Sequence, residues 1–370
     1  MRGDGVRVLI VGAGIAGLAT ARLLRDWGAA VEMIERTSAP APSGTGIYLL
    51  GNAVRALDAV GLARPVADLA VGIRGQRTAD HRGRLLFDVD VDEIWGGIGP
   101  CLAMHRADLH RILLDGAAGI PIRWDDSPQI IIPDGPDVTV ETTAGHVGHY
   151  DLVVGADGVH STVRRLILEV GAATPVGQYA YRFLAPWDGP LDQWSVMLGP
   201  GSAFLTIPIG NGQVYCYCDG PLRDPVVPLR NLLSDYAEPI TTLLGTLTRR
   251  DSDAAAAGPI EEVELDTWSR GNVLLIGDAA HATSPNMAQG AAMALEDAIV
   301  LAESLSTATL ITEVPAAFER RRRPRTDWVL AQTHRRDRAR NLPPRIRDVV
   351  LRHFGKRILH ANYGPLRENP

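Results

Sequence analysis

The fold is decided near the N-terminus by the stretch Val8-Leu9-Ile10-Val11-Gly12-Ala13-Gly14-Ile15-Ala16-Gly17. Its four leading apolar residues are typical of a buried parallel strand, its glycines of a tight turn, and residues 18–27 of a helix that opens at that turn. A second apolar run, residues 30–34, is followed by the acid Glu35. This order predicts a dinucleotide-binding unit, because the glycines let backbone amides approach a pyrophosphate and the acid lies in reach of a ribose.

Composition excludes several classes of protein. The chain has 370 residues, of which 46% are hydrophobic and 22% charged, which is ordinary for a globular protein with room for one large or two interleaved domains. A net charge of -6 argues against a nucleic-acid partner, so we interpret the run Glu319-Arg320-Arg321-Arg322-Arg323-Pro324-Arg325 as a solvated helix end.

The cysteines and the hydropathy pattern indicate the compartment. Cys101, Cys216 and Cys218 form neither a disulfide framework nor a zinc-binding spacing, and we expect packing thiols and no metal site. No run approaches the ~20 continuous apolar residues of a spanning helix. We therefore expect a cytoplasmic protein without a membrane span, and the pattern predicts no particular oligomeric state.

The pattern along the chain alternates between two kinds of structure. Residues 72–91 resemble a hairpin with its turn at 80–83, residues 104–113 a helix, and residues 179–217 an aromatic antiparallel sheet. Short buried strands are predicted before Ala156 and before Gly277. These segments predict a discontinuous nucleotide-binding domain (1–70, 101–170 and 268–310), a substrate-binding sheet domain (71–100 and 171–267) and a C-terminal helical segment (311–370).

A second motif follows the strand at residues 272–276 and reads Gly277-Asp278-Ala279-Ala280-His281-Ala282-Thr283-Ser284-Pro285. A strand that ends in Gly-Asp puts a carboxylate at the carboxyl edge of the sheet, where it can accept hydrogen bonds from a polyol. Pro285 is predicted to open a long helix, whose N-terminal amides stabilise negative charge on a reduced ring. We interpret His281 as a positioning residue.

Three separated stretches together resemble the FAD-dependent class A aromatic monooxygenases, the para-hydroxybenzoate and salicylate hydroxylase family. They are the N-terminal fingerprint with Glu35, Gly155-Ala156-Asp157-Gly158-Val159-His160-Ser161-Thr162-Val163-Arg164, and residues 277–298. Gly46-Ile47 with Asn52-Ala53, and His105-Arg106-Ala107-Asp108-Leu109, are similar to that family too. The resemblance implies an α/β fold: a Rossmann-like FAD-binding domain, an inserted, mostly antiparallel β-sheet substrate domain, and C-terminal helices.

The resemblance also implies the cofactors and the residues that contact them. FAD is the implied cofactor, with NADH or NADPH as cosubstrate and molecular oxygen as the oxidant. The implied FAD contacts are Gly12, Gly14, Ala16, Gly17, Glu35, Arg36, Gly46, Ile47, Arg106, Asp157, Gly277, Asp278, Pro285, Gly290 and Ala291. Pro285 and Gly290 are implied beside the reacting end of the ring, where a flavin hydroperoxide hydroxylates an aromatic or other electron-rich small molecule.

The substrate is expected between the flavin and the inserted sheet, and we expect Tyr181, Phe204, Tyr215 and Tyr217 to line it. Two alternatives share these motifs: an FAD-dependent reductase or dehydrogenase, and a noncatalytic flavin- or metabolite-binding protein. Three positions depart from the family pattern. Ser43-Gly44-Thr45 lacks an arginine, Gly51 replaces a proline, and Ala292 replaces an asparagine.

Overall fold

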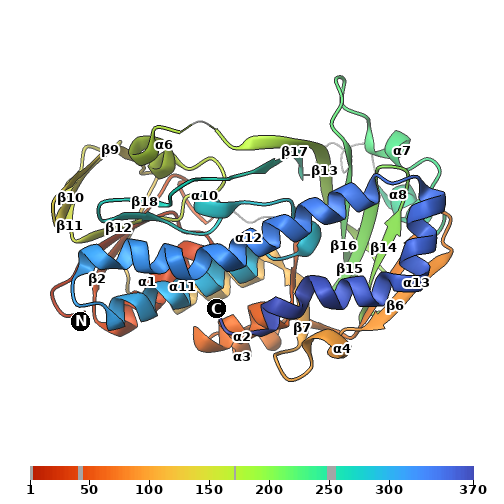
Figure 1. Cartoon of the computed structure of the whole chain (residues 1–370), viewed down its shortest axis with the longest axis horizontal. Coiled ribbons are helices and arrows are strands. Elements are labelled where there is room, and N and C mark those ends of the chain that lie inside the picture. Colours follow the sequence, from red (N-terminus) through yellow and green to blue (C-terminus); the bar gives the residue numbers. More distant parts are fainter. Residues whose placement is uncertain (1–2, 41–44, 171, 248–255) are drawn as a thin grey trace.

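The computed structural model describes residues 3–40, 45–170, 172–247 and 256–370; Ser43 and Gly44 lie outside them. Figure 1 shows an elongated molecule with a parallel sheet toward one end of the long axis and a larger antiparallel sheet toward the other. The long helix α12 (Val314–Arg340) runs from the first sheet to the second. The mixed α/β class with C-terminal helices is therefore confirmed.

The parallel sheet has six strands in the order β18-β19-β12-β1-β2-β8. β1 pairs in parallel with both β12 and β2, and only the edge strand β18 is antiparallel. The central residues are fully buried because helices and a small sheet cover both faces, which explains their continuous apolar sequence. The bounds are β1 Arg7–Val11, β2 Ala30–Glu35, β8 Ile122–Trp124, β12 Leu152–Gly155, β18 Ser269–Arg270 and β19 Val273–Leu275.

Helices pack around this sheet and join its segments. α1 (Ile15–Trp27) packs against α11 (Gly290–Thr307) and α5 (Arg106–Gly116), and α11 in turn packs against α2 (Gly51–Ala59) and α12. The shorter helices are α3 Ala63–Ala67, α4 Asp92–Trp95, α6 Thr162–Leu168 and α10 Asp278–His281. The last long helix is α13 (Pro344–Tyr363).

Two three-stranded antiparallel sheets accompany the parallel one. The first joins β9 (Pro128–Asp134), β10 (Asp137–Thr142) and β11 (Val147–Tyr150) as a meander. The second has the order β3-β7-β4 and brings Gly46 opposite His105. Its strands are β3 Gly46–Leu49, β7 Cys101–His105 and β4 Val71–Ile73.

The large sheet has seven strands in the order β17-β13-β16-β15-β14-β5-β6. All neighbours are antiparallel except β14 and β5. The hairpin β5–β6 comes from the early part of the chain and the other five strands from the later part, so two distant segments build one sheet. The bounds are β5 Gly75–Asp80, β6 Leu85–Asp90, β13 Thr174–Pro186, β14 Gln193–Leu198, β15 Ala203–Gly210, β16 Gln213–Pro221 and β17 Ala256–Glu262.

Two predicted helix starts were wrong. Met104 and His105 end β7, because Met104 is buried opposite Ile47, and the helix begins only at Arg106. Pro285 opens a single 3-10 turn, Pro285–Met287, rather than α11 itself. Ala288 then takes a left-handed conformation, with φ of 50°, and this bend separates the turn from α11.

Two short helices, α7 (Leu229–Leu232) and α8 (Ile240–Thr246), cover the large sheet on the side away from the parallel sheet. Among the described residues, no helix is both long and apolar enough to cross a membrane. The remaining 3-10 turns are Ile311–Glu313 and Gly364–Arg367.

Candidate active site

Side chains hold the glycine turn after β1 from both sides. Glu35 Oε2 accepts the Ala13 N–H at 2.8 Å, and Glu35 Oε1 accepts the Thr37 N–H at 3.0 Å. Across the turn, His110 Nε2 lies 2.8 Å from the Ala13 carbonyl oxygen. Glu35 is only half-buried, and its oxygens keep lone pairs for a ribose. His110 was not predicted from the sequence, although its position one helical turn after Arg106 is a usable signal.

The same turn leaves open space for a phosphate group. Gly12 has a φ of 107°, and a Cβ there would lie 2.4 Å from the Ala156 carbonyl oxygen, so only glycine fits. A Cβ on Gly14, the residue that precedes α1, would meet no atom within 4 Å. α1 has no acid in its first turn, and its leading amides have no partner within the helix. The residues present therefore fit a pyrophosphate.

Asp278 lies at the carboxyl edge of the parallel sheet with its side chain exposed. It is the first residue of α10 and directly follows Gly277, whose φ is 58°. A Cβ on Gly277 would lie 3.0 Å from the Ala16 Cβ, so this motif packs directly against α1. Within the described residues Asp278 has no hydrogen bond or ion pair to another side chain. Its carboxylate is therefore available to a ligand that lies over the glycine turn.

Asp157 uses both of its carboxylate oxygens within the protein. Oδ1 accepts the Ser161 hydroxyl at 2.5 Å, and Oδ2 accepts the Thr162 and Val163 N–H groups at 2.6 and 3.1 Å. Burial raises the pKa of Asp157, although these hydrogen bonds lower it in part. The carboxylate of Asp157 therefore fixes the loop between β12 and α6, and a contact between Asp157 and the cofactor stays a prediction.

Two arginines expected at the cofactor have exposed side chains. Arg36 follows β2, and Arg106 begins α5, where its backbone N–H donates to the Thr45 carbonyl at 2.9 Å. Neither guanidinium has an acidic partner in the described part of the chain. Arg106 lies beside Gly46, since β3 and β7 bring Gly46 opposite His105. Both cations are therefore available to a diphosphate.

A largely buried ion network supports the Gly277-Asp278 motif from behind. Asp297 on α11 accepts the Gly277 N–H at 2.8 Å, the Arg322 Nε–H at 2.7 Å, and lies 2.7 Å from His281 Nε2. Arg322 also pairs with Glu296 at 3.0 Å. Burial raises the pKa of Asp297, but His281 and Arg322 outweigh it and hold that pKa below its ordinary value.

The network corrects the interpretation of the arginine run. Arg322 has 0% exposed side chain, so this run is not simply a solvated helix end. Two adjacent acids within the apolar α11 were the signal that a buried cation must approach. His281 pairs with Asp297, and its positioning role stays a prediction.

The turn at residues 285–289 is held by the C-terminal helices. Arg336 Nη1 donates to the Asn286 carbonyl at 2.7 Å, and the Tyr363 hydroxyl donates to the Met287 carbonyl at 3.2 Å. The N-cap residue of α11, Gln289, accepts from Asn52 at 2.9 Å. A Cβ on Gly290 would meet no atom within 4 Å. Pro285, Gly290 and Ala291 thus form a fixed edge with open space at the start of an 18-residue helix.

The four predicted substrate residues divide between the two faces of the large sheet. Tyr215 and Tyr217 belong to the main core that includes the parallel sheet. Tyr181 and Phe204 belong to a separate core with the helices α7 and α8. Side chains alternate along a strand, so these two pairs point in opposite directions.

The face toward the parallel sheet also carries a cation. Arg182 pairs with Tyr217 across β13 and β16, and its Cζ lies 5.4 Å from the Tyr217 ring centroid. Tyr215 packs against Gly46, where a Cβ would lie 2.4 Å from the Tyr215 Cβ. Burial raises the pKa of Tyr215 above its ordinary value, although Arg182 and Arg106 lower it in part. In the described residues no carboxylate pairs with Arg182, which the sequence analysis did not single out.

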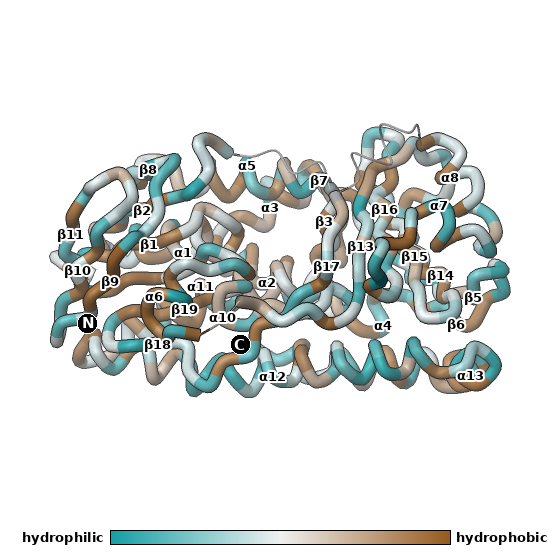
Figure 2. Tube along the Cα trace, turned by 90° about the horizontal axis from the view of Figure 1, so that it is seen from above, coloured by the Kyte–Doolittle hydropathy of each residue, from teal (hydrophilic) through white to brown (hydrophobic). Residues whose placement is uncertain are grey.

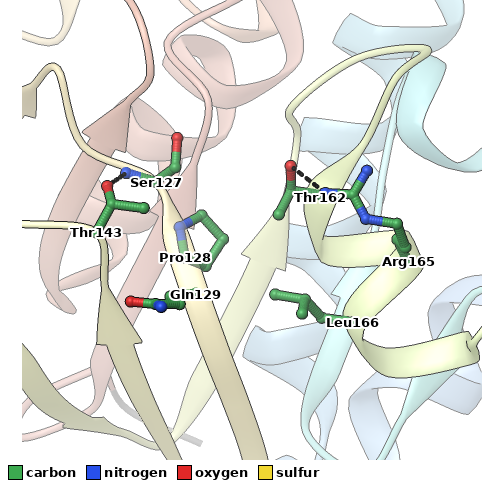
Figure 3. A pocket seen from close by; sticks show the side chains of 7 residues that line it. All are labelled: Ser127, Pro128, Gln129, Thr143, Thr162, Arg165 and Leu166. Carbon is green, nitrogen blue, oxygen red and sulfur yellow. Dashed lines mark hydrogen bonds between the residues drawn. The ribbon is translucent and has the colours of Figure 1, made fainter.

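Two other features contain none of the predicted site residues. Figure 3 shows a pocket between β9 and α6, lined by Ser127, Pro128, Gln129, Thr143, Thr162, Arg165 and Leu166. It contains none of the predicted site residues, and we do not place the active site there. In the described part of the chain, Glu262, Glu264 and His334 form one group with metal-ligating side chains, but Glu262 already accepts from the Ser284 N–H and contacts His334.

Comparison with known proteins identifies relatives of nearly the whole chain. Residues 5–330 match the family model described as FAD binding domain. The aurachin C monooxygenase/isomerase of Stigmatella aurantiaca is 32% identical over 85% of this chain and 84% of its own length. The 2-heptyl-3-hydroxy-4(1H)-quinolone synthase of Pseudomonas aeruginosa is 33% identical over 88% and 87%. The structure of Klebsiella pneumoniae HpxO with FAD and uric acid shares the fold, with a TM-score of 0.90 at 24% identity over 100% of this chain and 98% of that one.

Proposed function

Because the chain belongs to the family of FAD-dependent class A aromatic monooxygenases, we propose that it binds FAD along the glycine turn after β1, the Gly277-Asp278 motif and the start of α11. We also propose that the large sheet presents the substrate to FAD. The protein is an FAD-dependent monooxygenase that uses NAD(P)H and molecular oxygen to hydroxylate an aromatic small molecule. FAD supplies the redox chemistry when bound, and the chain binds, orients and shields the reactants.

We assign the cofactor contacts from the charged side chains that lack a partner and from the glycines beside open space. Glu35 accepts the ribose hydroxyls, and the amides around Gly14 with Arg36 and Arg106 bind the diphosphate. Asp278 accepts hydroxyl groups of the ribityl chain. Gly46, Pro285 and Gly290 border the ring, with the amides of Gly290 and Ala291 available to negative charge on it.

The substrate site is assigned from one observation: Tyr215 packs directly against Gly46. This contact brings one face of the large sheet onto the strand that borders the proposed ring position. The same face carries Arg182, while Tyr181 and Phe204 lie on the other face and are left out of the site. We assign the site to Arg182, Tyr215 and Tyr217.

Arg182 favours a substrate whose ring bears an ionisable hydroxyl or ring N–H. Loss of that proton puts electron density into the ring, which aids attack on an electrophilic oxygen, and a guanidinium without a carboxylate partner stabilises the resulting anion. The quinolone in the name of the Pseudomonas relative is a ring system of this kind. The cytoplasm, where NAD(P)H is regenerated, is the compartment we assign, and the buried thiols of Cys101, Cys216 and Cys218 suit it.

An oxygen-incorporation experiment tests the function. Purified protein should be yellow and should release FAD rather than FMN on denaturation. In a screen of hydroxypyridines, quinolones and phenols, active compounds should stimulate NAD(P)H oxidation and gain one 18O atom from 18O2, whereas their O-methyl ethers should not. Stimulated oxidation without 18O in any product would instead favour a reductase, and FAD that resists reduction with every ligand would favour a noncatalytic protein.

Substitution of Asp278 tests the cofactor assignment. Asp278→Ala should weaken FAD binding by about 10- to 100-fold, because it removes charge-assisted hydrogen bonds. Titration of the apoprotein with FAD measures this, and Asp68→Ala, at an exposed position at the end of α3, is the matched control. Equal affinity in both variants would show that Asp278 does not contact FAD.

A further inference from the structure

Two buried amide side chains join α2 to the start of α11. Asn52 in the first turn of α2 and Gln289 directly before α11 are 0% and 1% exposed. Asn52 Nδ2 donates to Gln289 Oε1 at 2.9 Å, and Gln289 Nε2 donates back to Asn52 Oδ1 at 3.4 Å. Because the hydrogen bonds run in both directions and each prefers a narrow range of angles, the pair fixes how α11 begins relative to α2.

Charged side chains hold the pair in place. Asn52 Nδ2 also donates to Glu296 Oε1 at 3.3 Å. Arg322 and Arg325 bind that carboxylate at 3.0 and 2.7 Å, so Glu296 cannot turn away without breaking a buried ion network. Asn52 therefore has one acceptor within α11 and another at the start of that helix.

Gly51 brings Asn52 to this position. A Cβ on Gly51 would lie 2.7 Å from the Gly99 carbonyl oxygen and 2.9 Å from the Trp95 Cβ, so neither the proline of the family pattern nor any other side chain fits without a shift. The first turn of α2 therefore lies directly against the end of α4 and the residues that follow it. The departure at residue 51 thus has a packing reason, and it sets the depth at which α2 presents Asn52 to α11.

The pair leaves the start of α11 open to a ligand. The side chain of Gln289 is turned toward Asn52, and α11 has no side-chain cap. The Met293 N–H donates to the Gln289 carbonyl oxygen at 2.9 Å, whereas the amides of Gly290 and Ala291 precede that bond and have no partner within the helix. A shift of Gln289 moves these two amides, because they follow it in the chain.

The pair also joins the two sides of the proposed ring position. Gly46 on β3 and Asn52 on α2 lie on consecutive elements, whereas Gly290 begins α11, and Figure 2 shows α2 beside α11 between the parallel sheet and the large sheet. We propose that Asn52 is a positioning residue: through Gln289 it holds the first amides of α11 where they stabilise negative charge on reduced FAD. This inference rests on the proposed function and assigns to it a residue that acts through another.

The midpoint potential of bound FAD tests the proposal on the holoprotein. Asn52→Leu keeps a branched side chain but removes both hydrogen bonds to Gln289, so the amides after Gln289 are no longer held. The affinity for reduced FAD relative to oxidised FAD should fall about tenfold, which for a two-electron couple is a fall of about 30 mV in the midpoint potential. Reductive titration against a reference dye measures it.

A matched control separates positioning from the loss of a buried amide in general. Asn272→Leu makes the same change at a residue that is 1% exposed and donates to the carbonyl oxygens of Pro136 and Asp151 at 2.9 and 3.0 Å. It should reduce stability and leave the potential unchanged. Gln289→Met should lower the potential as Asn52→Leu does, and the double variant should lower it no further, because the two residues act as one unit.

Three results would overturn the proposal. They are an unchanged potential in Asn52→Leu, an equal fall in Asn272→Leu, and additive falls in the double variant. If Asn52→Leu does not retain FAD, an unchanged potential in Gln289→Met has the same meaning. In each case a wild type that binds FAD and incorporates oxygen keeps the monooxygenase assignment, whereas a wild type that binds no FAD would overturn both.

Discussion

The parallel sheet and the large antiparallel sheet position their functional groups by different means. At the parallel sheet, the proposed ligand contacts combine the side chains of Glu35, Arg36, Arg106 and Asp278 with backbone amides of glycine turns. Buried side chains such as Asp157 and Asp297 hold those turns from behind. At the large sheet, the proposed contacts are the side chains themselves, presented on one face by strand alternation. Ligand binding at the parallel sheet thus depends on the buried groups that hold the turns. At the large sheet it depends on which face the helices α7 and α8 leave uncovered.

This difference separates the two regions experimentally. A change behind the parallel sheet should reduce stability and cofactor retention together, because the support and the binding site are one structure. A change on the large sheet should affect turnover only where it lies on the face that carries the proposed substrate site. Variants in each region therefore test whether the two sheets position their ligand contacts by different means.

The largest effect is expected from Arg322→Met. This change removes the cation between Glu296 and Asp297 and leaves buried carboxylates without full compensation. The free energy of unfolding should fall by about 3–5 kcal/mol. Urea denaturation of the holoprotein measures the loss, and the FAD content after purification should fall with it.

The neighbouring arginine provides the control for that variant. Arg321 pairs with Glu303, and both side chains are largely exposed, at 42% and 50%. Arg321→Met should therefore change the free energy of unfolding by at most about 1 kcal/mol. Equal losses in the two variants would mean that the buried network does not support the parallel sheet as described.

A smaller effect is expected from one substitution made on each face of the large sheet. Tyr217 donates to Asp219 at 2.8 Å beside Arg182, and Tyr181 donates to the Val227 carbonyl at 2.6 Å beneath α7. Tyr217→Phe leaves the Asp219 carboxylate with one donor fewer beside Arg182. It should lower kcat/KM about tenfold for a substrate found in the oxygen-incorporation screen and should also cost about 1.5–3 kcal/mol of stability, as loss of one hydrogen bond to a charged group does. Tyr181→Phe should leave kcat/KM unchanged and cost about 1 kcal/mol of stability.

Steady-state kinetics and urea denaturation of both variants check the assignment of the faces. If Tyr181→Phe impaired turnover and Tyr217→Phe did not, the substrate would lie on the face covered by α7 and α8. The proposed site would then be on the wrong side of the sheet.

The contrast between the regions also explains what the sequence could predict. The turn residues Gly12 and Gly17 were found from the sequence because close backbone approach leaves no alternative to glycine, and Gly277 because its left-handed φ favours glycine. Fold class and family followed from such positions. The role of Asp157 was harder to predict, because the same motif allows its carboxylate to face a ligand or to cap α6, and local hydrogen bonds decide between them.

The sequence alone could not assign the aromatic side chains of the large sheet to one face or the other. β13 and β16 carry aromatic residues on both faces, so period-two alternation alone does not say which face meets the parallel sheet. The answer depends on the helices α7 and α8, which cover Tyr181 and Phe204. Arg322 was misread for a related reason: its partners are 25 or more residues away in sequence, on another helix.

The smallest expected effect is a pair of opposite pH dependences at the parallel sheet. Burial raises the pKa of Asp157 in the folded protein, whereas His281 and Arg322 hold the pKa of Asp297 below its ordinary value despite burial. The contribution of Asp297 to stability is thus present above the unfolded pKa of about 3.9 and is lost as the pH falls through its folded pKa. The contribution of Asp157 is present at low pH and is lost as the pH rises through its folded pKa.

Urea denaturation between about pH 3 and pH 7 should separate the two carboxylates. The stability difference between wild type and Asp297→Asn should shrink toward acid pH, because the wild type loses the benefit of its ionised carboxylate there. The difference between wild type and Asp157→Asn should shift in favour of the wild type over the same range, since protonation removes the cost of a buried charge. Slopes of the same sign would mean that the ion network around Arg322 does not distinguish the two carboxylates, although both hold backbone amides at the edge of one sheet.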